Sequence, residues 1–304
     1  MSQHEPISVR FHAPPADLRK FFTTFYLTEF DPPDGETIED SLHPEWAGLR
    51  LFDGPGPESW IGRDPPVSAQ FSVTGPSSRA IHFRLGKTRF WGIGLLPLGW
   101  AQFAAGSAAD CANLIGDGLV EPAFAPFREL WERLYQGQSN ELAELARIVA
   151  FFRARATPLH RDARRIGAIH AALVDPEIGT VVELAEQVGA GQRTVERLCL
   201  RVFGFPPKLL LRRQRIMRSI SQFMLDPSLK WIGSIDSHYH DQAQFVRDFK
   251  EFMGVTPSDY AATPHPVLLT FMRARERIAG AAVQTLDSPK GVETAPVAGS
   301  GRAA

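Results

Sequence analysis

Cysteine is nearly absent from this chain, since only Cys111 and Cys199 occur among 304 residues. The two lie far apart, without a CxxC pair or a histidine cluster at ligand spacing, so the sequence predicts neither a disulfide framework nor a zinc site. P-loop, GxGxxG and nucleophile-elbow motifs are missing as well. We therefore expect no metal, no cofactor and no catalytic residue.

Long apolar runs are also missing. No stretch reaches the roughly 18 residues that a membrane-spanning helix needs. The N-terminus, MSQHEPISVRFHAPP, lacks the charged start and apolar core of a signal peptide. We expect a cytoplasmic protein without a membrane partner. Hydrophobic residues make up 44% and charged residues 22%, as in ordinary folded proteins, and the length allows two domains.

The net charge of -1 conceals two halves of opposite sign. Residues 1–152 contain 12 lysines and arginines against 19 acidic residues, a balance of -7. Residues 153–277 contain 19 against 13, a balance of +6. A basic half beside an acidic half is typical of a chain in which one domain meets nucleic acid. A basic patch also suits an acidic protein or a membrane surface.

The first half has the pattern of β structure followed by helices. Up to about Gly118, the segments ISVRF, GLRLF, AQFSV and AIHFRL alternate or run apolar between Pro- and Gly-rich turns, which predicts a β sandwich or barrel. After Pro122, apolar residues recur at spacings of three and four and predict two helices. Residues 1–152 are therefore one predicted domain, and the basic segment 153–163 is the predicted linker.

The second half has a helical pattern. We expect helices at 164–174, 181–188 and 192–203, and a longer helix that opens at Pro206-Pro207 and ends at Leu225. After Gly280 the residues become small and weakly hydrophobic, so 280–304 is predicted to be a disordered tail.

The most informative stretch is YHDQAQFVRDFKEFMGVTPSDY, residues 239–260. Asp241 followed by Gln244 is a helix-start pattern. Gly254 followed by Pro257 is a helix stop. The phenylalanines between these signals fall on one face of a helix about three turns long, and we expect them to be buried: Phe245, Phe249 and Phe252.

The same pattern occurs 50 residues earlier, in GQRTVERLCLRVFGFPP, residues 191–207. A shorter helical segment precedes each copy, VVELAEQVG in the first and WIGSIDSHY in the second. Each copy is thus a helix, a tight turn and a second helix, followed by Gly and Pro. The identical pairs are Gln192 and Gln242, Arg197 and Arg247, Gly204 and Gly254, and Pro207 and Pro257.

Two helix-turn-helix units, at about 181–204 and about 231–254, predict binding to double-stranded DNA. Such a unit presents its second helix so that the N-terminal residues of that helix enter a major groove. Two units can meet successive grooves when they lie about 34 Å apart. The intervening helix of about 20 residues would measure about 30 Å, which is the right order of length for a spacer.

These residues resemble a known family. The pattern DQ-x-x-F-x-R-x-F-K-x-x-x-G-x-x-P-x-x-Y in the second copy is similar to the signature of the AraC/XylS family of bacterial transcription regulators, and ELAEQVGAGQRTVERLCLRVFGFPPK resembles that family's first unit. The resemblance covers residues 166–262. Residues 92–118 resemble, more loosely, the end of a cupin-like regulatory domain.

The resemblance implies a fold class and a domain plan. It implies an α+β multidomain chain, with a cupin-like β domain with helices at 1–152 for regulation or dimerisation. An all-α DNA-binding domain would follow at 164–265, with its two helix-turn-helix units joined by a long helix. Expected partners are promoter or operator DNA, RNA polymerase, a small-molecule effector in the N-terminal domain and a second copy of the chain.

The resemblance also implies which residues meet DNA. Base or groove contacts fall to Arg193, Glu196, Arg197, Gln242, Gln244 and Arg247. These side-chain types suit the task, because Arg bonds guanine, Gln bonds adenine and Glu accepts from cytosine. Phosphate contacts fall to Gln192, Thr194, Arg201, Lys208, Arg212, Arg213 and Lys250.

The second unit departs from the family pattern. His238 stands where the family usually has Gly in the turn, and Gly233 with Asp236 interrupts the supporting helix. We expect that helix to be short or distorted. The first unit, with Arg193 to Arg197, would then carry more of the affinity for DNA.

Other functions remain open at the level of sequence. One alternative is an enzyme, a metal-dependent cupin or a DNA-repair alkyl transferase, fused to a DNA-targeting domain. Clustered metal ligands would support the former, but His238 with His240, and His43 with His82, form no such cluster. A reactive thiol would support the latter, but Cys199 beside Leu198 has the pattern of a packed residue. The aromatic residues around Trp46, Trp60, Trp91 and Trp100 either form the core or line an effector pocket.

Overall fold

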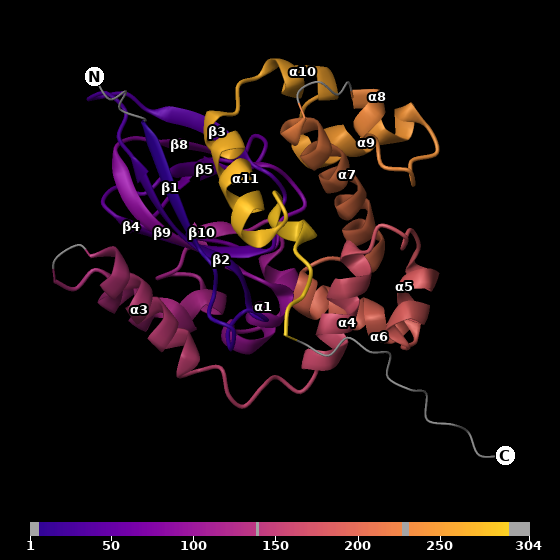
Figure 1. Ribbon diagram of the computed structural model, residues 1–304, viewed down its shortest axis with the longest axis horizontal. Helices are drawn as coiled ribbons and strands as arrows, with labels where there is room; N and C mark the ends of the chain where they lie inside the picture. The colour runs from indigo at the N-terminus through magenta and orange to yellow at the C-terminus, as the bar shows by residue number, and fades with distance from the viewer. Residues whose placement is uncertain (1–5, 138–139, 227–230, 292–304) are drawn as a thin grey trace.

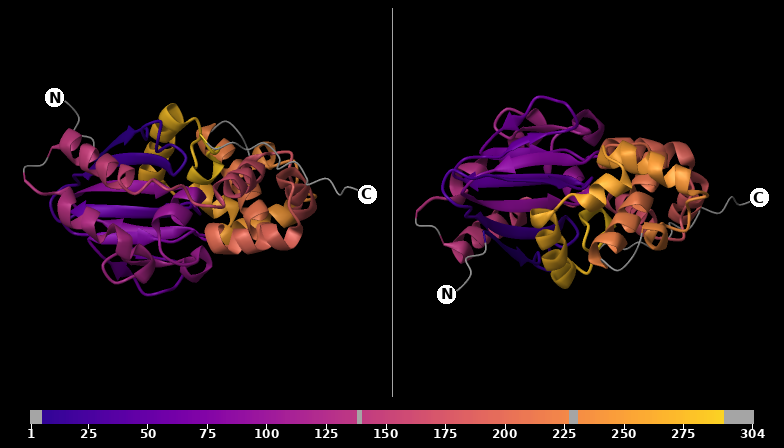
Figure 2. Two further views of the ribbon diagram at one scale, coloured as in Figure 1. Left: turned by 90° about the horizontal axis from the view of Figure 1, so that it is seen from below. Right: turned by 90° about the horizontal axis from the view of Figure 1, so that it is seen from above.

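The computed structural model describes residues 6–137, 140–226 and 231–291. A β-rich lobe from the N-terminal half lies beside a helical lobe from the C-terminal half, and the chain crosses back to the β lobe near its end (Figure 1, Figure 2). The predicted fold class is confirmed, since a β domain that carries helices precedes an all-α domain with two helix-turn-helix units.

The β lobe consists of two antiparallel sheets that face each other. One sheet has the strand order β1-β2-β9-β4-β7-β10 and the other the order β3-β8-β5-β6. Side chains alternate across each strand, so β4 directs Phe52 between the sheets and Leu49 and Leu51 to the opposite face. The strands are β1 Ile7–His12, β2 Phe22–Phe30, β3 Ile38–Leu42, β4 Ala47–Asp53, β5 Glu58–Trp60, β6 Val67–Ser68, β7 Phe71–Thr74, β8 Ile81–Leu85, β9 Thr88–Leu95 and β10 Ile115–Asp117.

Helices cover the outer face of the larger sheet. They are α1 Pro97–Phe103, η1 Ala108–Cys111, η2 Pro122–Phe127, α2 Arg128–Leu134 and α3 Glu141–Arg153. Glu144 of α3 is fully buried and accepts hydrogen bonds from Arg89 and, at 2.7 Å, from Trp91 Nε1 of β9. A buried carboxylate that is paired in this way fixes the helix to the sheet. Trp46, Trp91 and Trp100 are buried core residues, and Trp60 is half-buried.

The helical lobe has the helices that the sequence predicts and, in addition, α10. They are α4 Ala163–Val174, α5 Val181–Val188, α6 Gln192–Leu198, η3 Cys199–Phe203, α7 Pro207–Leu225, α8 Trp231–Ser234, α9 Gln242–Met253 and α10 Pro257–Ala262. Asp241 caps α9 by accepting from Gln244 N at 2.6 Å. Gly189, Gly204 and Gly254 end their helices with φ values of 63°, 85° and 75°, which favour glycine over residues that carry a Cβ.

The end of the chain corrects one prediction. Helix α11, Pro266–Ala279, lies against the β lobe, and η4, Gln284–Leu286, lies in a segment between the lobes (Figure 2). Ala282 and Val283 are buried, and Gln214 Nε2 donates to the carbonyl of Thr285 at 2.7 Å. The prediction of a disordered tail is therefore wrong for 280–291, because small residues fit a narrow space that the sequence does not reveal. Residues 292–304 lie outside the described part.

The two lobes share a continuous core. The ring of Trp46 in the β lobe packs edge-on against His170 and Phe203 of the helical lobe, with centroids 5.6 and 5.7 Å apart. Asp40 of β3 accepts from the backbone amides of Val267 and Leu268, at 2.9 Å each, and so caps the start of α11. These contacts fix the helical lobe against the β lobe. In the described residues, no helix is both long and apolar enough to cross a membrane.

Candidate functional site

The first helix-turn-helix unit consists of α5 and α6. Val195 and Leu198 bury one face of α6, with 0% and 1% of their surface exposed. The opposite face carries Gln192, Arg193, Glu196 and Arg197, all exposed, while Thr194 is half-buried. The helix thus presents the predicted set of side chains to solvent, as groove entry requires.

The second unit consists of α8 and α9. The predicted stripe of Phe245, Phe249 and Phe252 is confirmed as core, with at most 1% of each side chain exposed. Trp231 of α8 and Tyr260 of α10 pack edge-on against Phe249 at 5.1 and 5.5 Å. The outward face of α9 presents Gln242, Arg247 and Lys250 to solvent.

Three arginines on these faces are available to a partner. The side chains of Arg193, Arg197 and Arg247 are exposed, and none makes a hydrogen bond or ion pair with another described residue. Arg197 and Arg247 occupy equivalent positions in the two units. An arginine without an intramolecular partner can donate all its hydrogen bonds to a base edge or a phosphate.

Gln244 is already engaged in the fold. It is half-buried, and its Oε1 accepts from the backbone amide of His240 at 3.3 Å, which helps to hold the start of α9. A base contact from Gln244 would require it to leave this bond. Its role as a base contact stays a prediction.

The predicted phosphate contacts divide into exposed and paired groups. Lys208 and Lys250 are exposed. Arg201 pairs with Asp162, and Arg212 pairs with Glu251 and, at 2.6 Å, with Asp248. A phosphate would have to compete with these carboxylates. The two arginines connect separate segments of the helical lobe, and their role as phosphate contacts stays a prediction.

Arg213 is a correction. It is 0% exposed, because this side of α7 faces the β lobe rather than solvent. Its guanidinium lies 3.9 Å from the centre of the Trp46 ring and donates to the carbonyl of Ser77 at 3.0 Å. Burial lowers its pKa to about 9. The prediction of a phosphate contact at Arg213 is wrong, and the residue joins the two lobes instead.

His238 connects the two units. In the described residues α8 spans Trp231–Ser234 and ends before Asp236; because residues 227–230 before it lie outside the described part, the shortness of the supporting helix stays a prediction. Asp236 binds Arg218 and accepts from the backbone amide of His238 at 3.0 Å. The His238 ring lies over Gly179, where a Cβ would approach its Cδ2 to 2.5 Å. Because Gly179 precedes α5, the residue that departs from the family pattern packs one unit against the other.

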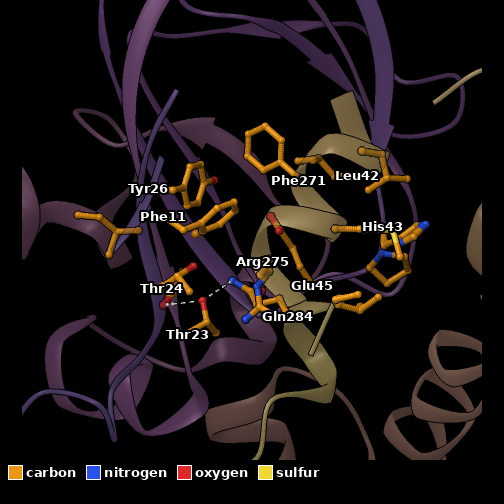
Figure 3. A pocket seen from close by; sticks show the side chains of 18 of the residues that line it. Phe11, Thr23, Thr24, Tyr26, Leu42, His43, Glu45, Phe271, Arg275 and Gln284 are labelled. Carbon is orange, nitrogen blue, oxygen red and sulfur yellow. Dashed lines mark hydrogen bonds between the residues drawn. The ribbon is translucent and has the colours of Figure 1, made fainter. Parts of the chain in front are cut away.

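A second candidate site lies between the β lobe and the C-terminal segment that contains α11. The outer cavity is lined by β1, β2, β4, the β3–β4 loop, α11 and residues 282–284. Figure 3 shows Phe11, Tyr26 and Phe271 together at one end, and Thr23, Arg275 and Gln284 at the other. A neighbouring inner chamber lies between the two sheets and is closed by Val267 and Phe271 of α11. Sequence analysis did not identify either space, because their walls come from distant segments.

Two glycines of β9 shape the outer cavity. At Gly92 a Cβ would approach Tyr26 Cζ to 1.9 Å, and at Gly94 it would approach Thr23 Oγ1 to 2.2 Å and Gln284 Nε2 to 2.3 Å. Larger residues at these positions would displace the side chains that line the space. The alternation of glycines is the sequence signal that could have indicated close packing here.

The charges around the outer cavity are paired. Arg50 is buried, donates to Glu45 Oε1 at 2.6 Å and to Thr74 Oγ1 at 3.2 Å. Burial opposes the charge on Arg50, but Glu45 and Tyr26 together outweigh burial and raise the pKa of the guanidinium. Burial, and next the neighbouring His265, lower the pKa of His43 to about 3. His43 is therefore neutral near pH 7 and shares a 2.7 Å hydrogen bond with Tyr260 Oη.

The described residues give the enzyme alternatives no support. Burial raises the pKa of the Cys111 thiol, and it raises that of Cys199 to about 12. A thiol in such a setting is not an activated nucleophile. Within the described ranges, no group of three or more His, Cys, Asp or Glu side chains is arranged to hold a metal ion. The absence of catalysis stays a prediction.

Comparisons with known proteins agree with the geometry of the helical lobe. A family model described as "Helix-turn-helix domain" matches residues 184–263, and the chain carries a helix-turn-helix domain of the AraC type there. No curated protein matches the chain.

Solved structures give looser similarities. ToxT from Vibrio cholerae is 13% identical, with a TM-score of 0.41, over 75% of this chain and 97% of that one. ToxT from Vibrio cholerae O395 bound to (E)-4-(8-methylnaphthalen-1-yl)but-3-enoic acid gives the same identity and TM-score, over 75% and 98%. The AraC-like transcriptional activator CuxR is 13% identical, with a TM-score of 0.22, over 71% and 88%.

Proposed function

We propose that this protein is a sequence-specific DNA-binding transcription regulator, controlled by a small-molecule effector in the outer cavity. The observation that carries the proposal is the equivalence of Arg197 and Arg247. Each lies on the solvent face of a second helix, and neither has a partner among the described residues. Helix α7 has 19 residues, which is about 28 Å at about 1.5 Å per residue. This length suits two units that read adjacent major grooves.

The effector part of the proposal rests on where the outer cavity lies. A ligand there would touch β2 and β4 of the β lobe and α11 of the chain segment that follows the second unit. His265, just before α11, stacks on Tyr260 at 4.2 Å, and Tyr260 packs against Phe249 of α9. A ligand that binds one arrangement of α11 better than another would shift the population of second-unit orientations.

The test uses the full-length chain and a random library of double-stranded DNA. The selected sequences should contain two half-sites whose centres are about 10 base pairs apart. Affinity should fall steeply with salt concentration, since phosphate contacts release counterions. The triple variant R193A/R197A/R247A should lose the sequence preference, whereas R133A, which removes an exposed arginine of α2, should keep it. Failure of the full-length chain to enrich any sequence at low salt would refute the proposal.

Two further partners follow from this function. RNA polymerase is the expected partner of a regulator bound at a promoter. A second copy of the chain, joined through the β lobe, is an alternative route of control. Light scattering of the full-length chain, with and without selected DNA, distinguishes a dimer from a monomer that responds to an effector alone.

A further inference from the structure

The outer cavity and the inner chamber form one site with two chemically different ends. They share Tyr26, Leu42, Arg50 and Phe271 as common walls. The inner chamber is lined mainly by rings and aliphatic side chains, with Phe52 and Phe90 stacked at 4.4 Å. A ligand group that enters it must be apolar, because unpaired polar groups are costly to bury there.

The polar end offers hydrogen bonds but no surplus charge. Arg50 is already neutralised by Glu45, and Arg275 by Asp287. Gln284 accepts from Trp46 N at 2.8 Å and donates to Thr23 Oγ1 at 3.5 Å, and Thr23 donates to the carbonyl of Gly94 at 3.4 Å. The second amide hydrogen of Gln284 and the remaining donors of Arg50 can still bind an uncharged oxygen or nitrogen. A ligand carboxylate would place a second anion beside a cation that Glu45 already holds at 2.6 Å. In a buried site that repulsion and the loss of hydration are both unfavourable.

We propose that the site binds a small neutral aromatic compound that carries one hydrogen-bonding group, such as an amide, and that Glu45 excludes the corresponding carboxylate. This inference rests on the effector role proposed above. It goes further because it assigns the chemical class of the effector and names Glu45 as the residue that determines specificity.

A matched pair of probes tests the inference. Phenylacetamide and phenylacetate have the same ring and nearly the same shape, but at pH 7.5 only the second is charged. Calorimetric titration of the full-length protein should show the amide binding at least tenfold more tightly than the carboxylate. Equal affinities, tighter binding of the carboxylate, or no binding of either probe would overturn the inference.

Glu45→Gln sharpens the test by changing the charge of the site. Without the Glu45 carboxylate, Arg50 lacks an anionic partner, so phenylacetate should bind at least tenfold more tightly than it binds the wild type and should become the preferred probe. The control is Glu36→Gln, which alters an exposed carboxylate on the same lobe and should leave both affinities unchanged. If Glu45→Gln does not fold, the affinities of the wild type for the two probes still test the inference.

DNA binding provides the separate readout. Sequence-specific DNA binding that persists while both probes fail to bind would reject the ligand class and leave the DNA-binding function intact. A wild-type protein that binds no DNA sequence specifically would refute the proposed function itself.

Discussion

In the first helix-turn-helix unit the supporting helix has eight residues, and its N-cap Thr180 forms a capping box with Glu183. In the second unit the described part of the supporting helix, Trp231–Ser234, ends before Asp236. The second unit compensates with aromatic packing, since Trp231, Tyr239 and Tyr260 surround the phenylalanines of α9. It is also tied to the β lobe, where Ala80 N donates to the carbonyl of Phe252 at 2.8 Å.

The comparison shows that two units with the same sequence pattern can be stabilised by different contacts. The first unit has a regular support of its own and shares a core with the β lobe through Phe203 and Trp46, whereas the second unit has a separate aromatic core that includes little of the β lobe. The second unit is the better candidate for control by a ligand, because a unit with its own core and fewer contacts to the neighbouring lobe can change its orientation as a rigid body.

The largest expected effect comes from the aromatic cluster. Phe249→Ala removes a fully buried ring and should lower the free energy of unfolding by about 3 to 5 kcal/mol. Denaturant titration of the full-length chain measures the change. Val182→Ala, at a position that is 51% exposed in the first unit, should change stability by less than about 0.5 kcal/mol. A small loss for Phe249→Ala would show that the cluster does not hold the second unit.

Acidification should weaken the contacts of both units with the β lobe. Burial lowers the pKa of His43, which meets Tyr260 beside the second unit, and of His170, in α4 beside the first, to about 3 each. Below about pH 6.5 these two histidines bind protons in the unfolded chain, whereas in the folded chain they stay neutral. Stability should therefore be complete above that pH and fall by about 1.4 kcal/mol per histidine for each pH unit below it.

Histidine variants assign this pH dependence to the two units. His43→Gln and His170→Gln should each reduce the slope of unfolding free energy against pH, measured between pH 6.5 and pH 4.5, and the double variant should reduce it by the sum. An unchanged slope in the double variant would mean that other groups govern acid unfolding.

DNA recognition should also divide unequally between the units. Arg197→Ala and Arg247→Ala should each cost about 1 to 3 kcal/mol of discrimination between the selected site and a mismatched one. We expect Arg197→Ala to have the larger effect, because α6 has the more regular support. Competition binding with matched and mismatched duplexes measures both, and a uniform loss on all sequences would assign an arginine to phosphate instead.

The smallest expected effect concerns the helix caps. Thr180→Ala removes the capping box of α5, and Asp241→Ala removes the bond to Gln244 N at the start of α9. Each should lower the free energy of unfolding by about 1 kcal/mol and the melting temperature accordingly. Thermal unfolding followed by circular dichroism tests this, and a much larger loss for Asp241→Ala would indicate that the second unit depends on its cap for folding.

Local patterns in the sequence determined the helical lobe. Caps, phenylalanine spacing and terminal glycines act within a few residues, so α5, α6, α7 and α9 could be predicted together with the solvent-facing positions of Arg197 and Arg247. The same logic located β1, β4, β7 and β8. Strands β2 and β9 were missed because they are buried on both faces, so their apolar and polar residues do not alternate.

Only the tertiary structure decided which polar side chains face solvent, the other lobe or a cavity. Arg212 and Arg213 are adjacent in a basic helix, yet one pairs with Asp248 and Glu251 while the other is buried under Trp46. Their difference depends on residues far away in the chain, which no local pattern encodes. The outer cavity depends in the same way on β2, β4, β9, α11 and residues 282–284, whose small residues indicated a tail until packing against both lobes gave them a role.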